Sequence, residues 1–158
     1  MSLLATYLND HLAGATAGRE LARRAASSNR GNATYGPPLE KLSAEIDEDR
    51  DSLLALMRAL DVGVDRLKVL AGWSAEKAGR LKLNGRVLSY SPLSRLVELE
   101  GLTLGVRGKL AMWESLLETH GEDPRLAGID LARLARRARA QQKTLEPLRL
   151  EASREALG

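Results

Sequence analysis

The fold of this chain is decided by Ser91–Leu117, which reads SPLSRLVELEGLTLGVRGKLAMWESLL. A serine followed by a proline is a typical helix start, because the serine caps the helix and the proline suits its first turn. The apolar residues that follow recur at the helical interval and predict one broad inward face. That face consists of Leu93, Leu96, Val97, Leu99, Leu104, Val106, Leu110 and Ala111. We expect the helix to end near His120 and Gly121.

Four polar residues project from the middle of that predicted face, namely Glu100, Thr103, Arg107 and Glu114. A buried charge without a partner costs too much free energy to be kept, so these side chains need partners on other helices. The pattern predicts that Glu100 and Arg107 lie at the centre of a buried ion-pair network.

The rest of the chain predicts three more long helices with the same periodicity. They cover Ser2–Ala26, Pro38–Leu60, and a segment from Pro124 or Ile129 to the C-terminus, in which Pro147 should cause a kink. A shorter helix is predicted over Val64–Leu83, with Leu67, Leu70, Trp73 and Leu81 available for packing and a turn at Asn84-Gly85. No alternating run is long enough for a sheet. We therefore predict an all-α fold, an antiparallel four-helix bundle with an additional short helix between the second and third long helices.

Length and composition indicate a single domain over residues 1–158, large enough to bury about two thirds of its unfolded surface. The absence of cysteine excludes disulfides, thiolate catalysis and cysteine-ligated metal sites. No stretch approaches the roughly 20 apolar residues of a membrane span, and the N-terminus lacks the pattern of a signal peptide. We expect a cytoplasmic protein with no membrane association.

Charge and aromatic content argue against a nucleic-acid partner. The net charge is only +3, aromatic residues make up 3% of the chain, and phenylalanine is absent, which leaves little surface for base stacking. The late arginines point around several sides of one helix instead of along one stripe; they are Arg133, Arg136, Arg137 and Arg139. Phosphate-binding loops, nucleophile elbows and zinc-protease motifs are also missing from the sequence. We do not expect an enzyme.

A set of polar residues recurs where the helical period calls for leucine: His11, Asp49, Glu100, Arg107, Gln142 and Arg149. One interpretation is a structural network in which Arg107 pairs with Asp49 or Glu100 and the other side chains satisfy hydrogen bonds. The alternative is a site for a metal or small ligand in the interior of the bundle. Both interpretations stay open from the sequence alone.

Helix lengths and the long connection after the second helix resemble the ferritin-like superfamily. Di-iron members of that superfamily place a glutamate on each of two helices and Glu-x-x-His on each of the other two. This chain departs from the pattern: Glu45 and Glu48 have no histidine three residues later, Glu100 is followed by Thr103, and Gln142 stands where an acid and a histidine would be needed. The other histidine, His120, falls at a helix end. The resemblance therefore implies a ferritin-like scaffold without a competent di-iron centre.

If a metal were bound, its candidate ligands are His11, Glu45, Asp49 and Glu100, with iron or manganese as the metal. We expect no cofactor, because the inward Arg107 would bring positive charge to the place where a dication would bind.

Glycines line one side of two predicted helices, Gly14 and Gly18 on the first and Gly101, Gly105 and Gly108 on the third. Glycine costs roughly 1 kcal/mol of helix propensity relative to alanine, so repeated glycines suggest close approach of another backbone. That approach can occur within the domain or across a dimer. The sequence thus predicts a structural or protein-interaction role, with a homo-oligomer formed through glycine-lined faces, and interior ligand binding as the alternative function.

Overall fold

A computed structural model describes residues 2–72, 74 and 89–158 of the chain, and these residues form helices and loops without any β-strand. In chain order the elements are α1 (Leu3–Ser28), α2 (Gly36–Ala59), α4 (Pro92–His120), the 3₁₀ turn η1 (Pro124–Leu126) and α5 (Leu131–Leu157). The all-α prediction is confirmed for this part of the chain. None of the described helices is both long enough and apolar enough to span a bilayer.

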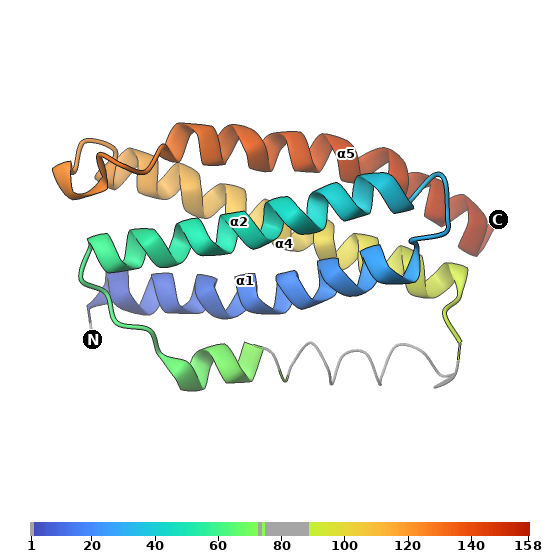
Figure 1. Ribbon diagram of the computed structural model, residues 1–158, viewed down its shortest axis with the longest axis horizontal. Helices are drawn as coiled ribbons and strands as arrows, with labels where there is room; N and C mark the ends of the chain where they lie inside the picture. Colours follow the sequence, from blue (N-terminus) through green and yellow to red (C-terminus); the bar gives the residue numbers. More distant parts are fainter. Residues whose placement is uncertain (1, 73, 75–88) are drawn as a thin grey trace.

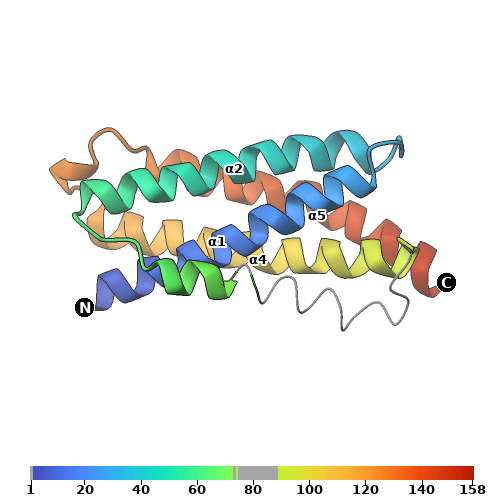
Figure 2. The same cartoon turned by 60° about the horizontal axis from the view of Figure 1, so that its bottom comes forward.

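The four long helices lie side by side and enclose one core (Figures 1 and 2). α1 and α5 run in one direction and α2 and α4 in the other (Figure 1). α1 packs against α2 and α4, and α5 packs against α4 and touches α2. α2 ends and α4 begins at opposite ends of the molecule (Figure 1). Each pair of neighbouring helices is consequently antiparallel.

Short polar side chains set the helix starts that the sequence predicted. Ser2 caps α1, accepting a hydrogen bond from the backbone N–H of Ala5 at 3.1 Å. At the start of α4 the Ser91 hydroxyl accepts from the Ser94 N–H at 3.1 Å, and the Ser94 hydroxyl accepts from the Ser91 N–H at 3.2 Å. This reciprocal box fixes the first turn of α4 where the sequence placed it.

The last helix starts later than either of its two predicted starts. Pro124 opens only the short turn η1, and α5 begins at Leu131 because the Asp130 carboxylate accepts a hydrogen bond from the backbone N–H of Arg133 at 2.8 Å. An aspartate in this position caps the exposed N–H groups of a first helical turn. The helix then continues through Pro147 to Leu157.

The connection between α2 and α4 is helical over residues 66–72. The predicted packing role of Leu67 and Leu70 is wrong, because these side chains are 80% and 56% exposed. The other predicted packing residues of this segment, Trp73 and Leu81, lie outside the described residues, as does the Asn84-Gly85 turn.

The buried face of α4 differs from the one that the sequence predicted. It comprises Leu96, Leu99, Leu102, Val106, Met112, Trp113 and Leu116 among the apolar residues. Leu93 and Leu104 are 48% and 71% exposed, and Ala111 is also exposed, so their predicted inward position is wrong. The reason is that α4 is apolar on both sides, and a period of 3.6 residues alone does not say which side meets the core.

Candidate functional site

The centre of the bundle contains a compact charged cluster around Asp49 of α2, whose side chain is 2% exposed. Lys109 of α4 and Arg137 of α5 both form ion pairs with this carboxylate. The Arg137 Nε donates to Asp49 Oδ1 at 2.8 Å, and the Gln141 Nε2 of α5 donates to Asp49 Oδ2 at 3.1 Å. Three helices therefore meet on one carboxylate.

Further polar contacts surround this central cluster. The Lys109 ammonium donates to the Gln141 Oε1 at 2.6 Å, and the Gln141 Nε2 also donates to Glu45 at 3.1 Å. The Arg137 guanidinium reaches Glu48 at 2.6 Å. Burial lowers the pKa of Lys109, and Asp49 is the nearby charge that opposes this shift most strongly. The negative charge of Asp49 therefore stabilises the protonated form of Lys109.

The sequence identified Asp49 correctly as an interior residue but assigned it the wrong partners. Glu100 and Arg107 are exposed and take part in no ion pair among the described residues, so their predicted burial is wrong. Glu114 is also exposed and pairs with Arg139, while Thr103 donates to the Leu99 carbonyl within α4. The cause is that α4 is rotated about its own axis relative to the orientation predicted from the sequence, and this rotation turns the row of polar residues away from the core.

On α5 the prediction missed by one residue. Gln142 is half-buried, whereas its neighbour Gln141, at 1% exposure, lies in the central cluster. Arg149 pairs with Glu146 of the same helix at 2.8 Å and does not join the cluster. A one-residue step turns a helical side chain by about 100°, enough to exchange an interior position for a flanking one.

A second charged cluster, which the sequence did not reveal, lies near the start of α4. Glu98 is 8% exposed and accepts from the Arg24 Nε at 2.8 Å and from the Tyr90 hydroxyl at 2.9 Å. Asn29 donates to that same hydroxyl at 2.8 Å, and Arg95 donates to Asn29 at 2.7 Å. These contacts join the end of α1 to the start of α4. Glu98 and Lys109 lie on the same side of α4 as Leu102 and Met112. That shared side was the feature of the sequence that could have identified both charged residues as interior.

A half-open cleft of about 210 Å³ lies between α1, α2 and α4, next to the central cluster. His11 and Asp49 both line this cleft, so two of the predicted site residues share it. The His11 ring packs edge-on against Tyr7 at 4.6 Å between centroids, and burial lowers the pKa of His11. We call this space the α1–α4 cleft.

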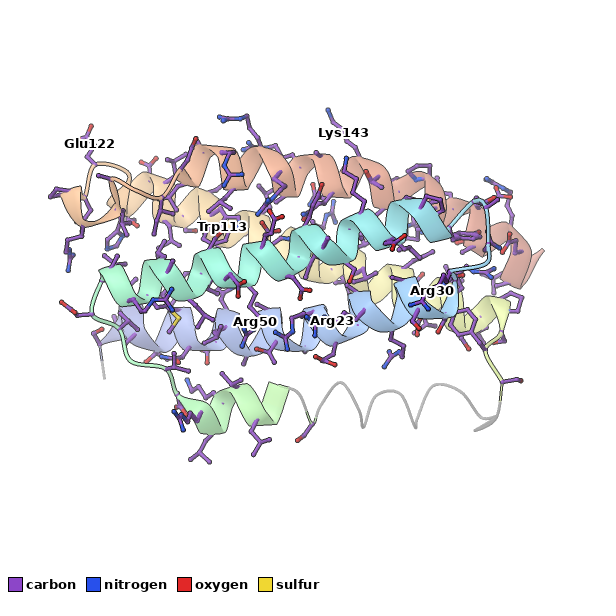
Figure 3. All side chains as sticks on the ribbon, in the orientation of Figure 1. Arg23, Arg30, Arg50, Trp113, Glu122 and Lys143 are labelled. Carbon is purple, nitrogen blue, oxygen red and sulfur yellow. The ribbon has the colours of Figure 1, made fainter. Side chains whose placement is uncertain are left out.

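The polar groups of the α1–α4 cleft are paired to different degrees. Asp10 pairs with Lys68 at 2.8 Å, and Asp49 has the two cations described above. Arg50 instead donates its Nε to the Thr16 hydroxyl at 3.1 Å, and its pKa is lowered by burial and by neighbouring Arg19. Arg50 lies along the side where α1 and α2 meet (Figure 3).

Trp113 forms part of the cleft wall and is fully buried within the bundle (Figure 3). Its indole Nε1 has no hydrogen-bond partner. A buried N–H without an acceptor is costly, and native proteins contain few of them.

The glycines also line the cleft, but close helix packing does not explain most of them. A Cβ placed on Gly14, Gly18, Gly105 or Gly108 would meet no described atom within 4 Å. At Gly101 the Cβ would lie 2.9 Å from the Leu21 Cδ2, which is a contact with a side chain and not with another backbone. Within the described residues, the predicted close approach of two helices at the glycines is therefore wrong, and the glycines leave open space instead.

The described residues contain no group of three histidine, aspartate or glutamate side chains that could hold a metal ion. The candidate ligands do not form such a group: Asp49 is engaged by cations, Glu45 accepts from Gln141, His11 lies in the cleft, and Glu100 is exposed. Comparison of the chain with protein-family models, with curated proteins and with solved structures found no match.

Proposed function

We propose that this chain is a ferritin-like bundle that serves as an interaction scaffold and associates with a second copy of itself. One long connection in an otherwise antiparallel bundle is the topology of ferritin-like folds. The opposite positions of the α2 end and the α4 start support that assignment (Figure 1).

The interior chemistry supports a structural and not a redox role for the centre of this scaffold. Lys109 and Arg137 direct two positive charges at Asp49, the carboxylate best placed to bind a dication. A dication there would have to displace both cations, leaving Lys109 buried without an ion-pair partner and Arg137 with Glu48 alone, and stranding a buried charge costs several kcal/mol. The cluster instead fixes how α2, α4 and α5 pack.

The observation that carries the proposal is the outer α4 stripe, the row of α4 side chains that faces away from the core. It consists of Leu93, Val97, Glu100, Leu104, Arg107 and Ala111. The spacing alternates between four and three residues, which is the seam of a helix that pairs with another helix. Leu104, near its centre, is 71% exposed, although exposing a leucine forgoes about 2 kcal/mol of burial energy.

The charges on the outer α4 stripe are complementary to those on its own copy. Glu100 and Arg107 are seven residues apart, which is about 10.5 Å along the helix. If two α4 helices pair antiparallel about a two-fold axis near Leu104, Glu100 faces Arg107 of the partner subunit, and the same pair forms again by symmetry. Such a self-complementary patch is what an isologous dimer requires.

Sedimentation velocity over a range of protein concentrations tests this proposal. The wild type should reversibly form a dimer, and Glu100→Arg or Arg107→Glu should weaken the dimer because like charges then face each other. The double variant Glu100→Arg/Arg107→Glu should restore it, since the pairs are re-formed with opposite polarity.

Lys143→Glu is the matched control, because Lys143 is exposed and points outward from α5 (Figure 3). This change alters the net charge as Arg107→Glu does and should leave the dimer intact. A wild type that stays strictly monomeric at high concentration, or single variants that sediment like the wild type, would overturn the proposal.

A further inference from the structure

An open groove lies where the connection after α2 passes α1 (Figure 2). Its volume is about 400 Å³, and small-ligand sites commonly have volumes of about 300–1,000 Å³. We call this space the Arg50–Arg66 groove, after the two cations that line it. Its apolar walls are Leu12, Leu54, Val64, Val69 and Leu70.

The connection that forms one wall of the groove is held in place by Asn9, a fully buried residue of α1. The Asn9 side-chain nitrogen donates to the Gly63 carbonyl at 2.9 Å, and the side-chain oxygen accepts from the Asp65 N–H at 2.6 Å. The Asp65 carboxylate caps the next helical turn, accepting from the backbone N–H groups of Leu67 and Lys68 at 3.0 and 3.2 Å. The groove is therefore preformed, and a ligand need not order this wall when it binds.

The two charged residues of the lining are both arginines, and the described residues contribute no acidic side chain to it. Neither Arg50 nor Arg66 forms an ion pair with any described residue. Nearby carboxylates already have cationic partners, and these pairs are Asp10 with Lys68 at 2.8 Å and Asp47 with Arg23 at 2.9 Å. The electrostatics of the groove therefore favour an anion.

The guanidinium of Arg50 is held at this groove and remains accessible there. Its Nε donates to the Thr16 hydroxyl at 3.1 Å, and Thr16 lines this groove and not the α1–α4 cleft. Neither terminal nitrogen has a partner among the described residues, and neither is enclosed by the protein, so solvent reaches both. Burial and Arg19 lower the pKa of Arg50 more strongly than the carboxylates of Asp51 and Asp47 raise it. A carboxylate can thus approach this guanidinium without displacing another acid.

The apolar walls of the groove reach the surface beside these cations. Leu70 and Val64 are 56% and 46% exposed, whereas Leu12 is fully buried. An alkyl chain laid along the groove would remove this apolar surface from water, which is favourable. An inorganic anion would leave the walls exposed, and a hydrocarbon would leave both arginines unpaired. The groove is therefore complementary to a molecule with an anionic head and an apolar chain.

We propose that the Arg50–Arg66 groove binds a free anionic amphiphile, a single alkyl chain with a carboxylate head. The head pairs with the two arginines, and the chain lies along the apolar walls. This site goes beyond the proposed self-association, because it uses α1, α2 and the connection and no residue of the outer α4 stripe.

Octanoate is a suitable probe, because acetate has the same head without the chain and 1-octanol has a chain of the same length without the charge. Isothermal titration calorimetry of the full chain should show saturable binding of monomeric octanoate, and the melting temperature should rise with its concentration. 1-Octanol should bind about tenfold more weakly, since it lacks charge-assisted hydrogen bonds. Hexanoate should also bind about tenfold more weakly, because it has two methylene groups fewer to bury. Acetate should not bind measurably.

Variants of the two arginines test the position of the head. Arg66→Gln changes an exposed side chain, so it should weaken octanoate at least about fivefold while leaving 1-octanol binding and thermal unfolding nearly unchanged. Arg50→Gln should act in the same direction. The matched control Arg30→Gln changes an exposed arginine in the loop before α2 and should bind octanoate like the wild type (Figure 3).

A substitution in the apolar wall tests the position of the chain. Leu70→Ser should weaken octanoate and 1-octanol alike by about threefold, because both ligands lose the same apolar contact. Leu67→Ser is the matched control, since Leu67 belongs to the same helical segment, is 80% exposed and does not line the groove. This control should leave the binding of both ligands unchanged.

Equal affinity for octanoate and 1-octanol, or octanoate binding that survives both arginine substitutions unchanged, would overturn the proposal. Equal losses of octanoate binding in Leu67→Ser and Leu70→Ser would overturn it too. Binding to vesicles of anionic lipid without binding of free octanoate, or no binding by the wild type at all, would likewise contradict a site for the free amphiphile.

Discussion

At the scale of single residues, the stability of the bundle centre depends on Asp49, because its carboxylate pairs with two largely buried cations, of which only Arg137 has a second carboxylate partner, Glu48. Lys109 and Arg137 have side chains only 14% exposed. A buried ion pair adds little net stability, but removing one partner leaves the other charge in a low-dielectric interior. Removal of the shared carboxylate and removal of one cation should therefore have unequal effects on stability.

Substitution of Asp49 should be far more damaging than substitution of Lys109. Asp49→Asn leaves the buried Lys109 without an ion-pair partner and Arg137 with Glu48 alone, and should lower the free energy of unfolding by about 3 to 5 kcal/mol. Lys109→Met leaves Asp49 with Arg137 and Gln141 and should cost less than about 1.5 kcal/mol. Urea unfolding of both variants measures the difference, and equal losses would contradict the assignment of Asp49 as the shared acceptor.

His11 should make folding sensitive to mild acid. Burial lowers its pKa in the folded protein below the usual 6.5, while nearby Asp10 acts in the opposite direction. The unfolded chain then binds the proton more readily, so the contribution of His11 is complete above about pH 6.5 and declines as the pH falls through the lowered pKa. His11→Gln should flatten the decrease in unfolding free energy between about pH 7 and pH 5. An unchanged pH dependence would show that His11 does not titrate in this way.

At the scale of elements, α4 shows what periodicity determines and what it leaves open. Ser91 and Pro92 predicted its start and His120 its end, because caps and prolines act locally. Its rotation was not predictable from apolar residues, since both sides of α4 carry them and the outer α4 stripe has the more regular spacing. Glu98 and Lys109 decide the rotation only when Arg24 and Asp49 are brought beside them by the tertiary fold.

The effect of a glycine-to-alanine substitution on the free energy of unfolding should depend on the space around each helical glycine. Gly14→Ala and Gly105→Ala meet no described atom and should raise the free energy of unfolding by up to about 1 kcal/mol. Gly101→Ala places a methyl group against Leu21 at 2.9 Å, so that side chain must move and most of the gain should be lost. Thermal unfolding compares the three variants; a gain at Gly101 equal to the others would contradict the packing described there.

At the scale of the whole molecule, the helices, their approximate limits and the interior position of Asp49 follow from local patterns in the sequence. The partners of Asp49 do not, because they come from α4 and α5 and depend on how four helices are rotated against each other. The α1–α4 cleft was unpredictable for the same reason: His11, Arg50 and Trp113 are distant in sequence and meet only in the bundle. The outer α4 stripe, misassigned to the core by its pattern, is instead the surface proposed to meet a second copy.

Site-specific disulfide trapping at Leu104 tests that central claim most directly, since the chain has no cysteine of its own. In an antiparallel α4 pair with its axis near Leu104, the two copies of a Leu104→Cys variant place their thiols close together and should oxidise rapidly to a covalent dimer. Glu122→Cys, in the exposed loop after α4 (Figure 3), is the control and should react slowly. Fast trapping at 104 and slow trapping at 122 is the predicted result, and equal slow rates at both positions would contradict the account.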